Sequence, residues 1–176
     1  AAAVVLPPDY FHLAINDSKV LTAGQRQLLR AEIEKEALAW AVCFVDNEEI
    51  DRVNILNASF LAMNRAVQLL AQPPEHLIVD GNRFRPQPYN HMPYTCVVKG
   101  DRKYLSIAAA SILAKTHRDD YMETLHQQFP HYEWCQNKGY PTALHRKAIR
   151  QHGISPYHRK SFTLLPNELD LFSGEG

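Results

Sequence analysis

The sequence predicts a single α/β domain, because short apolar runs alternate with longer segments of helical periodicity. The strand-like runs, rich in β-branched and aromatic residues, lie at 40–45, 77–80 and 95–101. Apolar residues recur at helical spacing at about 23–38, 54–71, 105–128 and 142–152. With 176 residues the chain can bury one sizeable core, and no repeat or low-complexity linker divides it. We therefore expect one domain over 1–176, with an irregular tail at 164–176.

Local signals support the bounds of these elements. Thr22 and Gln25 have the spacing of a capping box at the start of the first helix. Pro73 and Pro74 stop the second helix, and Gly153 closes the last one. The opening AAAVVLPP is typical of the second half of a strand that ends in a Pro-Pro turn. Because natural chains rarely begin inside a strand, we expect a further amino-terminal segment before it.

Charge and composition narrow the classes of partner. Basic and acidic residues number 19 each, so the formal net charge is zero and any surface for nucleic-acid phosphates must be local. The three cysteines show no metal-ligand spacing and no signal peptide is recognisable, which indicates free thiols in a cytoplasmic protein. No apolar run approaches the roughly 18 residues that a membrane span requires.

Two aspartates at the ends of predicted strands are the central observation. Asp80 follows the apolar run 77–79, and Asp101 closes the run 95–101. Ligands of α/β sheets lie beyond the carboxyl ends of strands, and hard cations such as Mg²⁺ take oxygen ligands. The pair is therefore a candidate for a shared divalent cation. Spacing alone equally permits a structural interpretation, in which each aspartate forms a turn beside a glycine.

A polar stripe interrupts the small and apolar residues of the helix predicted at 105–128. Ser111, Lys115 and Asp119 follow one another at four-residue steps and so share one face. Lys115 is a candidate contact for a substrate phosphate. The alternative is a solvated ion pair between Lys115 and Asp119, which contributes only a few tenths of a kcal/mol.

Two further positions suit a nucleic-acid ligand. Tyr140, in the run NKGYPT, presents a flat ring at a loop-to-helix corner, where it can stack on a sugar or base. A half-buried packing tyrosine is the alternative. Lys19, in the run NDSK, precedes a predicted helix start and is either a phosphate contact or an ordinary solvated lysine.

Six sequence segments, by their order and by the residues they contain, resemble a known protein family. The segments are NDSKVLTAGQR, NILNASFLAMNRAV, LIVDGN, VVKGDRKYLSIAAASILAKTHRD, NKGYPTALHRKAIRQHG and HRKSF. Together they closely resemble bacterial ribonuclease HII, the type 2 ribonuclease H, from about residue 1 to 163. The resemblance implies a ribonuclease H-like fold with a central mixed sheet flanked by helices and a mainly helical carboxyl-terminal part.

The resemblance also implies an activity and roles for residues. The family hydrolyses the RNA strand of RNA/DNA hybrids and cuts at single ribonucleotides in duplex DNA, leaving 3′-hydroxyl and 5′-phosphate ends, with Mg²⁺ or Mn²⁺ in a two-ion site. By motif, Asp80 and Asp101 match two of four metal-binding carboxylates, and Tyr140 matches the tyrosine that senses the ribonucleotide. Lys19 and Lys115 match positions near the substrate backbone, and Ser111 on the same stripe is a further candidate substrate contact.

The family's first motif, Asp-Glu-x-Gly-Arg-Gly, does not occur in the 176 residues. In the family this motif supplies the other two carboxylates and a loop that meets the ribonucleotide. We therefore expect the 176 residues by themselves to be inactive as a nuclease.

The remaining expectations concern partners and competing functions. The resemblance implies a monomer, and the tail SFTLLPNELDLF is a candidate contact for a replication clamp. One competing interpretation is a non-catalytic nucleic-acid-binding protein, and another is the related type 3 ribonuclease H, although NKGYPT favours type 2. A small-molecule α/β enzyme is the third, but no glycine-rich phosphate loop supports it.

Overall fold

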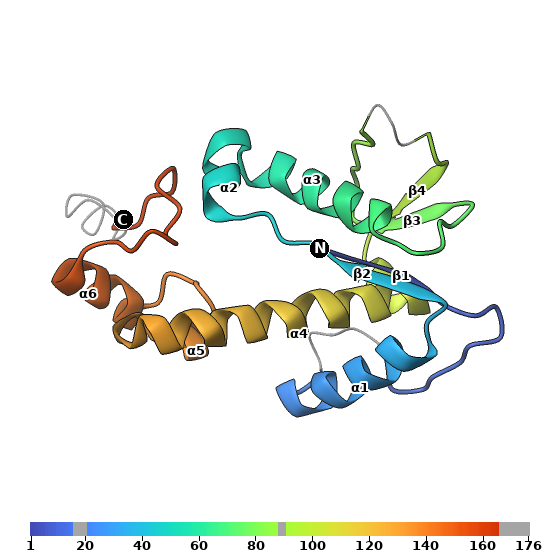
Figure 1. Cartoon of the computed structure of the whole chain (residues 1–176), viewed down its shortest axis with the longest axis horizontal. Coiled ribbons are helices and arrows are strands. Elements are labelled where there is room, and N and C mark those ends of the chain that lie inside the picture. Colours follow the sequence, from blue (N-terminus) through green and yellow to red (C-terminus); the bar gives the residue numbers. More distant parts are fainter. Residues whose placement is uncertain (16–20, 88–90, 166–176) are drawn as a thin grey trace, which may run out of the picture. The chain divides into compact units, whose positions relative to one another are not determined.

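The computed structural model describes residues 1–15, 21–87 and 91–165. The chain divides into two compact units, each considered by itself: Ala1–Val45 with Ile55–Arg118, and Asp46–Asn54 with Asp119–Gly176. Strands occur in the first unit, and the described part of the second is helical apart from its turns and loops (Figure 1). No described helix has the length and apolarity needed to cross a membrane.

The first unit holds the strands and the helices that pack on them. Its elements are β1 (Ala2–Val5), α1 (Ala23–Glu36), β2 (Ala39–Val42), α3 (Ile55–Gln68), β3 (Leu77–Asp80), β4 (Tyr94–Val97), η1 (Gly100–Arg102) and the first part of α4 (Leu105–Gln128). The strands form two pairs, β1 with β2 antiparallel and β3 with β4 parallel. In the described part of the chain the strands thus form two separate two-stranded sheets, not the one central mixed sheet that the resemblance implies.

Helices cover both faces of the β1–β2 pair (Figure 1). Side chains alternate between the faces of a strand, so Val4 and Trp40 pack on the core of α1 and α4. Val5 and Ala41 point to the other face, where they pack near Leu70 just after α3. The pair is thus the middle layer between α3 on one side and α1 with α4 on the other.

The main core of this unit lies between α1 and α4. Ile33 of α1 and Ile112 and Leu113 of α4 have no exposed surface. The predicted capping box of α1 is confirmed, because Gln25 N–H donates to Thr22 Oγ1 at 3.2 Å and Thr22 N–H donates to Gln25 Oε1 at 2.8 Å. The cap fixes where α1 begins and therefore which of its side chains face α4.

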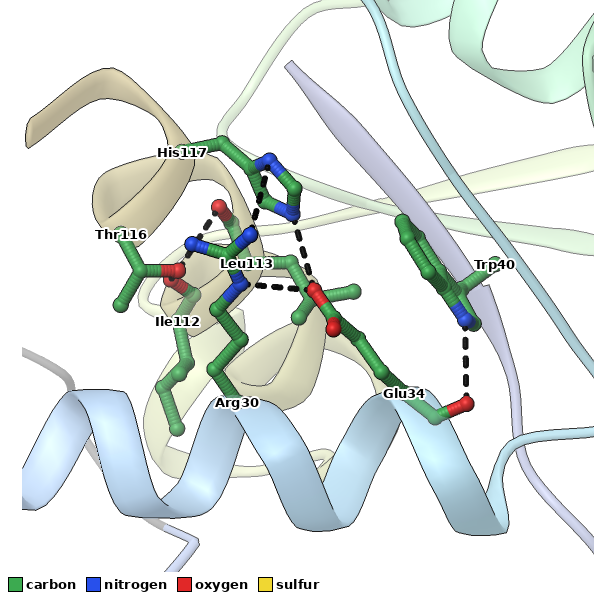
Figure 2. A network of polar contacts seen from close by, with 7 residues as sticks. All are labelled: Arg30, Glu34, Trp40, Ile112, Leu113, Thr116 and His117. Carbon is green, nitrogen blue, oxygen red and sulfur yellow. Dashed lines mark hydrogen bonds and ion pairs between the residues drawn. The ribbon is translucent and has the colours of Figure 1, made fainter. Parts of the chain in front are cut away.

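A polar network completes the packing of α1, β2 and α4 (Figure 2). The Glu34 carboxylate accepts a hydrogen bond from Arg30 Nε at 2.7 Å and lies 2.9 Å from His117 Nε2. Arg30 also approaches His117 Nδ1 at 3.4 Å, so Nδ1 suits the role of acceptor and Nε2 that of donor to Glu34. Trp40 donates from its indole nitrogen to the Glu34 carbonyl at 3.1 Å. Four residues from three elements are thereby held in one arrangement.

The second unit is a small helical cluster built around aromatic side chains. Its elements are α2 (Asn47–Val53), the last part of α4, η2 (Pro130–Tyr132), α5 (Trp134–Asn137) and α6 (Ala143–His152). Met122, Tyr132, Trp134 and Ile149 are buried in its core. Leu164, at the start of the predicted tail, packs against the same core, and 166–176 lies outside the described residues.

Candidate functional site

β3 and β4 end side by side at one edge of their sheet. The register places Asp80 opposite Val97, and Gly81 N–H donates to the Val97 carbonyl at 3.0 Å just beyond the last pair. Because the two strands run in the same direction, the loops that follow them leave from the same edge. Asp80, the last residue of β3, and Asp101, in the segment that follows β4, are the two predicted metal-binding aspartates.

A hydrogen bond joins the two loops. The backbone N–H of Gly100 donates to Asp80 Oδ1 at 2.9 Å. A Cβ at position 100 would lie 3.4 Å from that oxygen and 2.5 Å from Cδ1 of Ile107, so a glycine in front of Asp101 permits this close approach. The Asp80 carboxylate is thereby fixed beside the residue that precedes Asp101.

Asp101 lies in a different element from the one the sequence predicts. The prediction of a strand over 95–101 is wrong at its end, since β4 stops at Val97 and Asp101 belongs to the single turn η1. Lys99 adopts a left-handed conformation, with φ of 55°, and this turns the chain out of the sheet. Asp101 is buried with 4% exposure, whereas Asp80 is exposed. The pair therefore combines one accessible and one enclosed carboxylate.

The arrangement suits a hard, hydrated cation. Among the described residues, no group of three or more histidine, cysteine or acidic side chains is placed to hold a metal ion. Mg²⁺, however, usually keeps several waters and binds through one or two carboxylates together with substrate phosphates. Asp80 is exposed to such an ion, and its bond to Gly100 fixes the direction of its carboxylate. The donor set is oxygen only, which fits Mg²⁺ or Mn²⁺.

The other predicted contacts of the first unit lie further along α4 or outside the described residues. Ser111 and Lys115 are both half-buried on α4. At 1.5 Å per residue, Lys115 lies roughly 15 Å along the axis from the first residue of the helix. Lys19 falls outside the described residues.

Tyr140 stands on a tightly built loop of the second unit. Its side chain is 67% exposed, so the interpretation of a half-buried packing tyrosine is wrong. The buried Asn137 shapes the loop, because its amide nitrogen donates to the Tyr132 carbonyl at 2.7 Å and its oxygen accepts the Gly139 N–H at 2.8 Å. Gly139 has a φ of 80°, and Thr142 then caps α6 by accepting the His145 N–H. The loop presents the ring of Tyr140 from a fixed backbone.

Two stacked histidines lie in the core of the same unit. The rings of His145 and His158 are 5.3 Å apart and nearly parallel, and both side chains are buried. His158 Nδ1 accepts the N–H of Ser155 at 3.0 Å, whereas its Nε2 is buried with no hydrogen-bond partner among the described residues. Burial, and to a smaller degree His145, lower the pKa of His158 to about 4.

His158 makes the stability of the chain depend on pH in the acidic range. The unfolded chain takes up a proton near the ordinary histidine pKa of 6.5, but the folded chain does so only near 4. The contribution of His158 to the free energy of unfolding is therefore fully present above pH 6.5. It falls by about 3 kcal/mol as the pH is lowered toward 4. Urea unfolding between pH 7.5 and 4 measures this loss.

Two histidine variants separate this effect from general acid sensitivity. His158→Asn keeps an acceptor for Ser155 and removes the titration, so its stability should change less between pH 6.5 and 4 than that of the unmodified chain. His91→Asn, at an exposed position, should retain the original pH dependence. Equal pH dependence in the unmodified chain and His158→Asn would contradict the assignment to His158.

Comparison with known sequences decides the family. The sequence model described as Ribonuclease HII matches residues 1–165 of the chain. The chain belongs to the ribonuclease HII family. A Ribonuclease HII of Parabacteroides distasonis is 63% identical over 171 residues, covering 97% of this chain and 85% of the relative. One of Phocaeicola vulgatus is 61% identical over 171 residues, covering 97% and 84%. The predicted family is confirmed, and the chain is a ribonuclease H rather than a small-molecule enzyme.

Solved structures of ribonuclease HII share the fold. The ribonuclease H2 of Pyrococcus horikoshii OT3 has a TM-score of 0.72 at 25% identity, covering 86% of this chain and 78% of the other. A PCNA:RNase HII complex of Archaeoglobus fulgidus gives 0.70 at 25% identity, with coverages of 91% and 84%. An RNase HIII, Bst-RNase HIII in complex with Mn²⁺, gives 0.58 at 21% identity, with 80% and 52% covered. The predicted ribonuclease H-like α/β fold is confirmed.

One structural residue next to the site was missed in the sequence. Asn64 has no exposed surface, although it sits in the middle of α3. Its amide nitrogen donates to the carbonyls of Phe60 at 2.8 Å and Arg85 at 2.9 Å, and its oxygen accepts the Gln87 N–H at 3.0 Å. Asn64 therefore anchors the loop that follows Asp80. A polar residue four positions after Phe60, on the apolar stripe of a predicted helix, was the available signal.

Proposed function

We propose that the chain is the core of an endonuclease that hydrolyses RNA paired with DNA and also cuts at a single ribonucleotide in duplex DNA. The observation that carries the proposal is the Asp80–Gly100 hydrogen bond, which holds the Asp80 carboxylate beside the residue that precedes Asp101, at one edge of the β3–β4 pair, in a member of the ribonuclease HII family. No side-chain nucleophile is needed for this chemistry, since the attacking group is water.

In this proposal Asp80 and Asp101 hold the divalent cation or cations, Mg²⁺ or Mn²⁺. A Mn²⁺ complex is known for the structural neighbour Bst-RNase HIII, which supports this choice of metal. The bound ions would activate the attacking water and stabilise the leaving 3′-oxygen during in-line displacement. Gly100 keeps the Asp80 carboxylate in one orientation, so that little rearrangement is needed when substrate arrives.

Residues outside the carboxylate pair bind and distinguish the substrate. Lys115, Lys19 and Ser111 are proposed contacts for the nucleic-acid backbone, so binding should weaken as salt concentration rises. Tyr140 is proposed to lie against the sugar at the ribonucleotide, because the 2′-hydroxyl is the group that distinguishes RNA from DNA. Its 67% exposure on a rigid loop suits this role.

The tail is the proposed site of one protein contact. A structural neighbour is a complex of RNase HII with PCNA, which supports a contact between the segment SFTLLPNELDLF and a replication clamp. The chain is otherwise proposed to act as a monomer.

Substrate discrimination by Tyr140 tests the proposal. The protein for this assay is residues 1–176 preceded by the Asp-Glu-x-Gly-Arg-Gly segment of a family relative, here termed the extended protein. It should cut both a continuous RNA/DNA hybrid and a DNA duplex with one ribonucleotide, and Tyr140→Ala should lose at least about tenfold more kcat/KM on the second substrate. Gel analysis of end-labelled strands measures both rates.

Tyr140→Phe is the matched control, because it keeps the flat ring and removes only the hydroxyl. It should stay within about threefold of the unmodified protein on both substrates if stacking is the main role. An equal loss on both substrates in Tyr140→Ala would indicate a general structural role for the loop. Absence of any divalent-cation-dependent cleavage by the extended protein would refute the proposed function itself.

A further inference from the structure

A pocket of about 540 Å³ opens beside the loop that follows Asp80. Its walls come from α3, β4 and the loop segment 82–85, all in the first unit. Two arginines, an asparagine and three aromatic rings are the lining residues that matter here: Asn82, Arg83, Phe84, Arg85, Phe60 and Tyr94. The proposed metal-binding and substrate-binding residues do not include any of them.

The charge of the pocket is positive. Of the described residues, no aspartate or glutamate lines it, and both Arg83 and Arg85 are exposed. Within the described part of the chain, neither guanidinium forms an ion pair with a carboxylate. A guanidinium has five donors in a planar fork that matches phosphate oxygens. Two unpaired arginines in one small pocket therefore favour a phosphate ligand.

Aromatic rings provide an apolar surface beside these charges. Phe84 contacts Phe60 edge-on at 6.4 Å between ring centroids and Tyr94 at 5.2 Å. Tyr94 remains 41% exposed, so part of its ring is open to a ligand. A positive groove with exposed aromatic rings is the combination that holds the backbone and the sugars or bases of nucleic acids.

The loop that carries the arginines is held in place. The buried amide of Asn64 bonds to the Arg85 carbonyl and to the Gln87 N–H, which fixes the loop to α3. A ligand of Arg83 and Arg85 therefore meets a backbone that is already ordered, which reduces the entropy lost on binding.

We propose that this pocket is a subsite for one backbone phosphate, with its nucleoside, of the nucleic-acid substrate. Asn82 is two residues beyond Asp80, so their Cα atoms are at most about 7 Å apart. Because a duplex rises by about 3.4 Å per base pair, the phosphate lies roughly one to three nucleotides from the scissile one. The subsite rests on the proposed function, since it assumes that Asp80 faces the scissile phosphate.

Salt-dependent binding tests the subsite. Fluorescence anisotropy of a labelled RNA/DNA hybrid, without divalent cations, gives the affinity of residues 1–176 and of the variants Arg83→Gln and Arg85→Gln. Each variant should lose about five- to tenfold in affinity at low salt and reduce the slope of log affinity against log salt by about 1. Lys35→Gln, which removes one exposed charge at the end of α1, should change the affinity less than twofold.

The aromatic part of the subsite has its own pair of variants. Tyr94→Ala should weaken hybrid binding at least about fivefold without changing the salt slope, because a ring carries no charge. Tyr94→Phe should bind within twofold of the unmodified chain. Thermal unfolding of every variant checks that the fold is retained, and Arg85→Lys, which keeps the charge, should keep the salt slope.

The outcomes separate this inference from the proposed function. If the extended protein cuts the hybrid but both arginine variants keep the original affinity and salt slope, the subsite is wrong and the proposed function stands. A change in Lys35→Gln as large as in Arg83→Gln would also overturn it, since charge alone would then explain the effect. If the unmodified extended protein neither binds nor cuts the hybrid, the proposed function fails, and the subsite fails with it.

Discussion

Asp80→Asn is expected to reduce kcat/KM of the extended protein on an RNA/DNA hybrid by at least about 1000-fold, which corresponds to about 4 kcal/mol of transition-state stabilisation. An amide is neutral, so it is a far poorer ligand for a hard divalent cation than a carboxylate. The amide oxygen of asparagine can still accept the N–H of Gly100, so the two loops should stay joined. The substitution therefore removes the charge while keeping the local structure.

Binding and cleavage must be measured together to interpret this variant. Hybrid affinity without divalent cations should stay within about threefold of the unmodified protein, because Asp80 repels phosphates rather than attracting them. Asp9→Asn, at an exposed turn position far along the sequence from both motif aspartates, is the matched control and should retain full activity. Turnover by Asp80→Asn within tenfold of the unmodified protein would remove Asp80 from the metal site.

The elements that the sequence predicts well are those with two agreeing local signals. The helix predicted at 105–128 coincides with α4, and the capping box at Thr22 places the start of α1 correctly. α2 was missed because it is short, although Asp46 accepts the Glu49 N–H at 2.8 Å and the pair has capping spacing. A helix of so few residues has no long apolar stripe for periodicity to detect.

The sequence predicts which residues form the candidate site, but it does not predict how they are arranged. The motif order singles out Asp80 and Asp101, yet no local pattern places Asp101 in a turn after Lys99 has left the sheet. The hydrogen bond from Gly100 to Asp80 joins residues 20 positions apart, and the burial of Asp101 is a property of the folded chain. Such contacts follow from strand pairing, and spacing along the chain does not encode them.

Asn64 and the pocket lined by Arg83 and Arg85 illustrate a different limit of prediction from the sequence. An asparagine on an apolar stripe signals a buried hydrogen-bonding role, but its partners at Arg85 and Gln87 belong to a loop without regular structure. Arg83 and Arg85 look like ordinary solvated charges in the sequence. Only the fold places aromatic rings from α3 and β4 around them.

A polypeptide of residues 1–176 alone is expected to cut an RNA/DNA hybrid at less than about 1% of the rate of the extended protein. Among the described residues, no third acidic, histidine or cysteine ligand joins Asp80 and Asp101. The proposed two-ion site would draw on more carboxylate oxygens than two side chains provide, because each additional charge would raise the occupancy of the second ion. Initial rates over a range of Mg²⁺ and Mn²⁺ concentrations measure the difference.

A third version of the protein separates the effect of the added carboxylates from the effect of the added chain. In it, the Asp and Glu of the added segment are replaced by Asn and Gln, so the added residues can pack but cannot bind a cation strongly. This version should be as inactive as residues 1–176, while its thermal stability should match that of the extended protein. Activity of residues 1–176 within tenfold of the extended protein would show that Asp80 and Asp101 suffice, and the requirement for four carboxylates would be wrong.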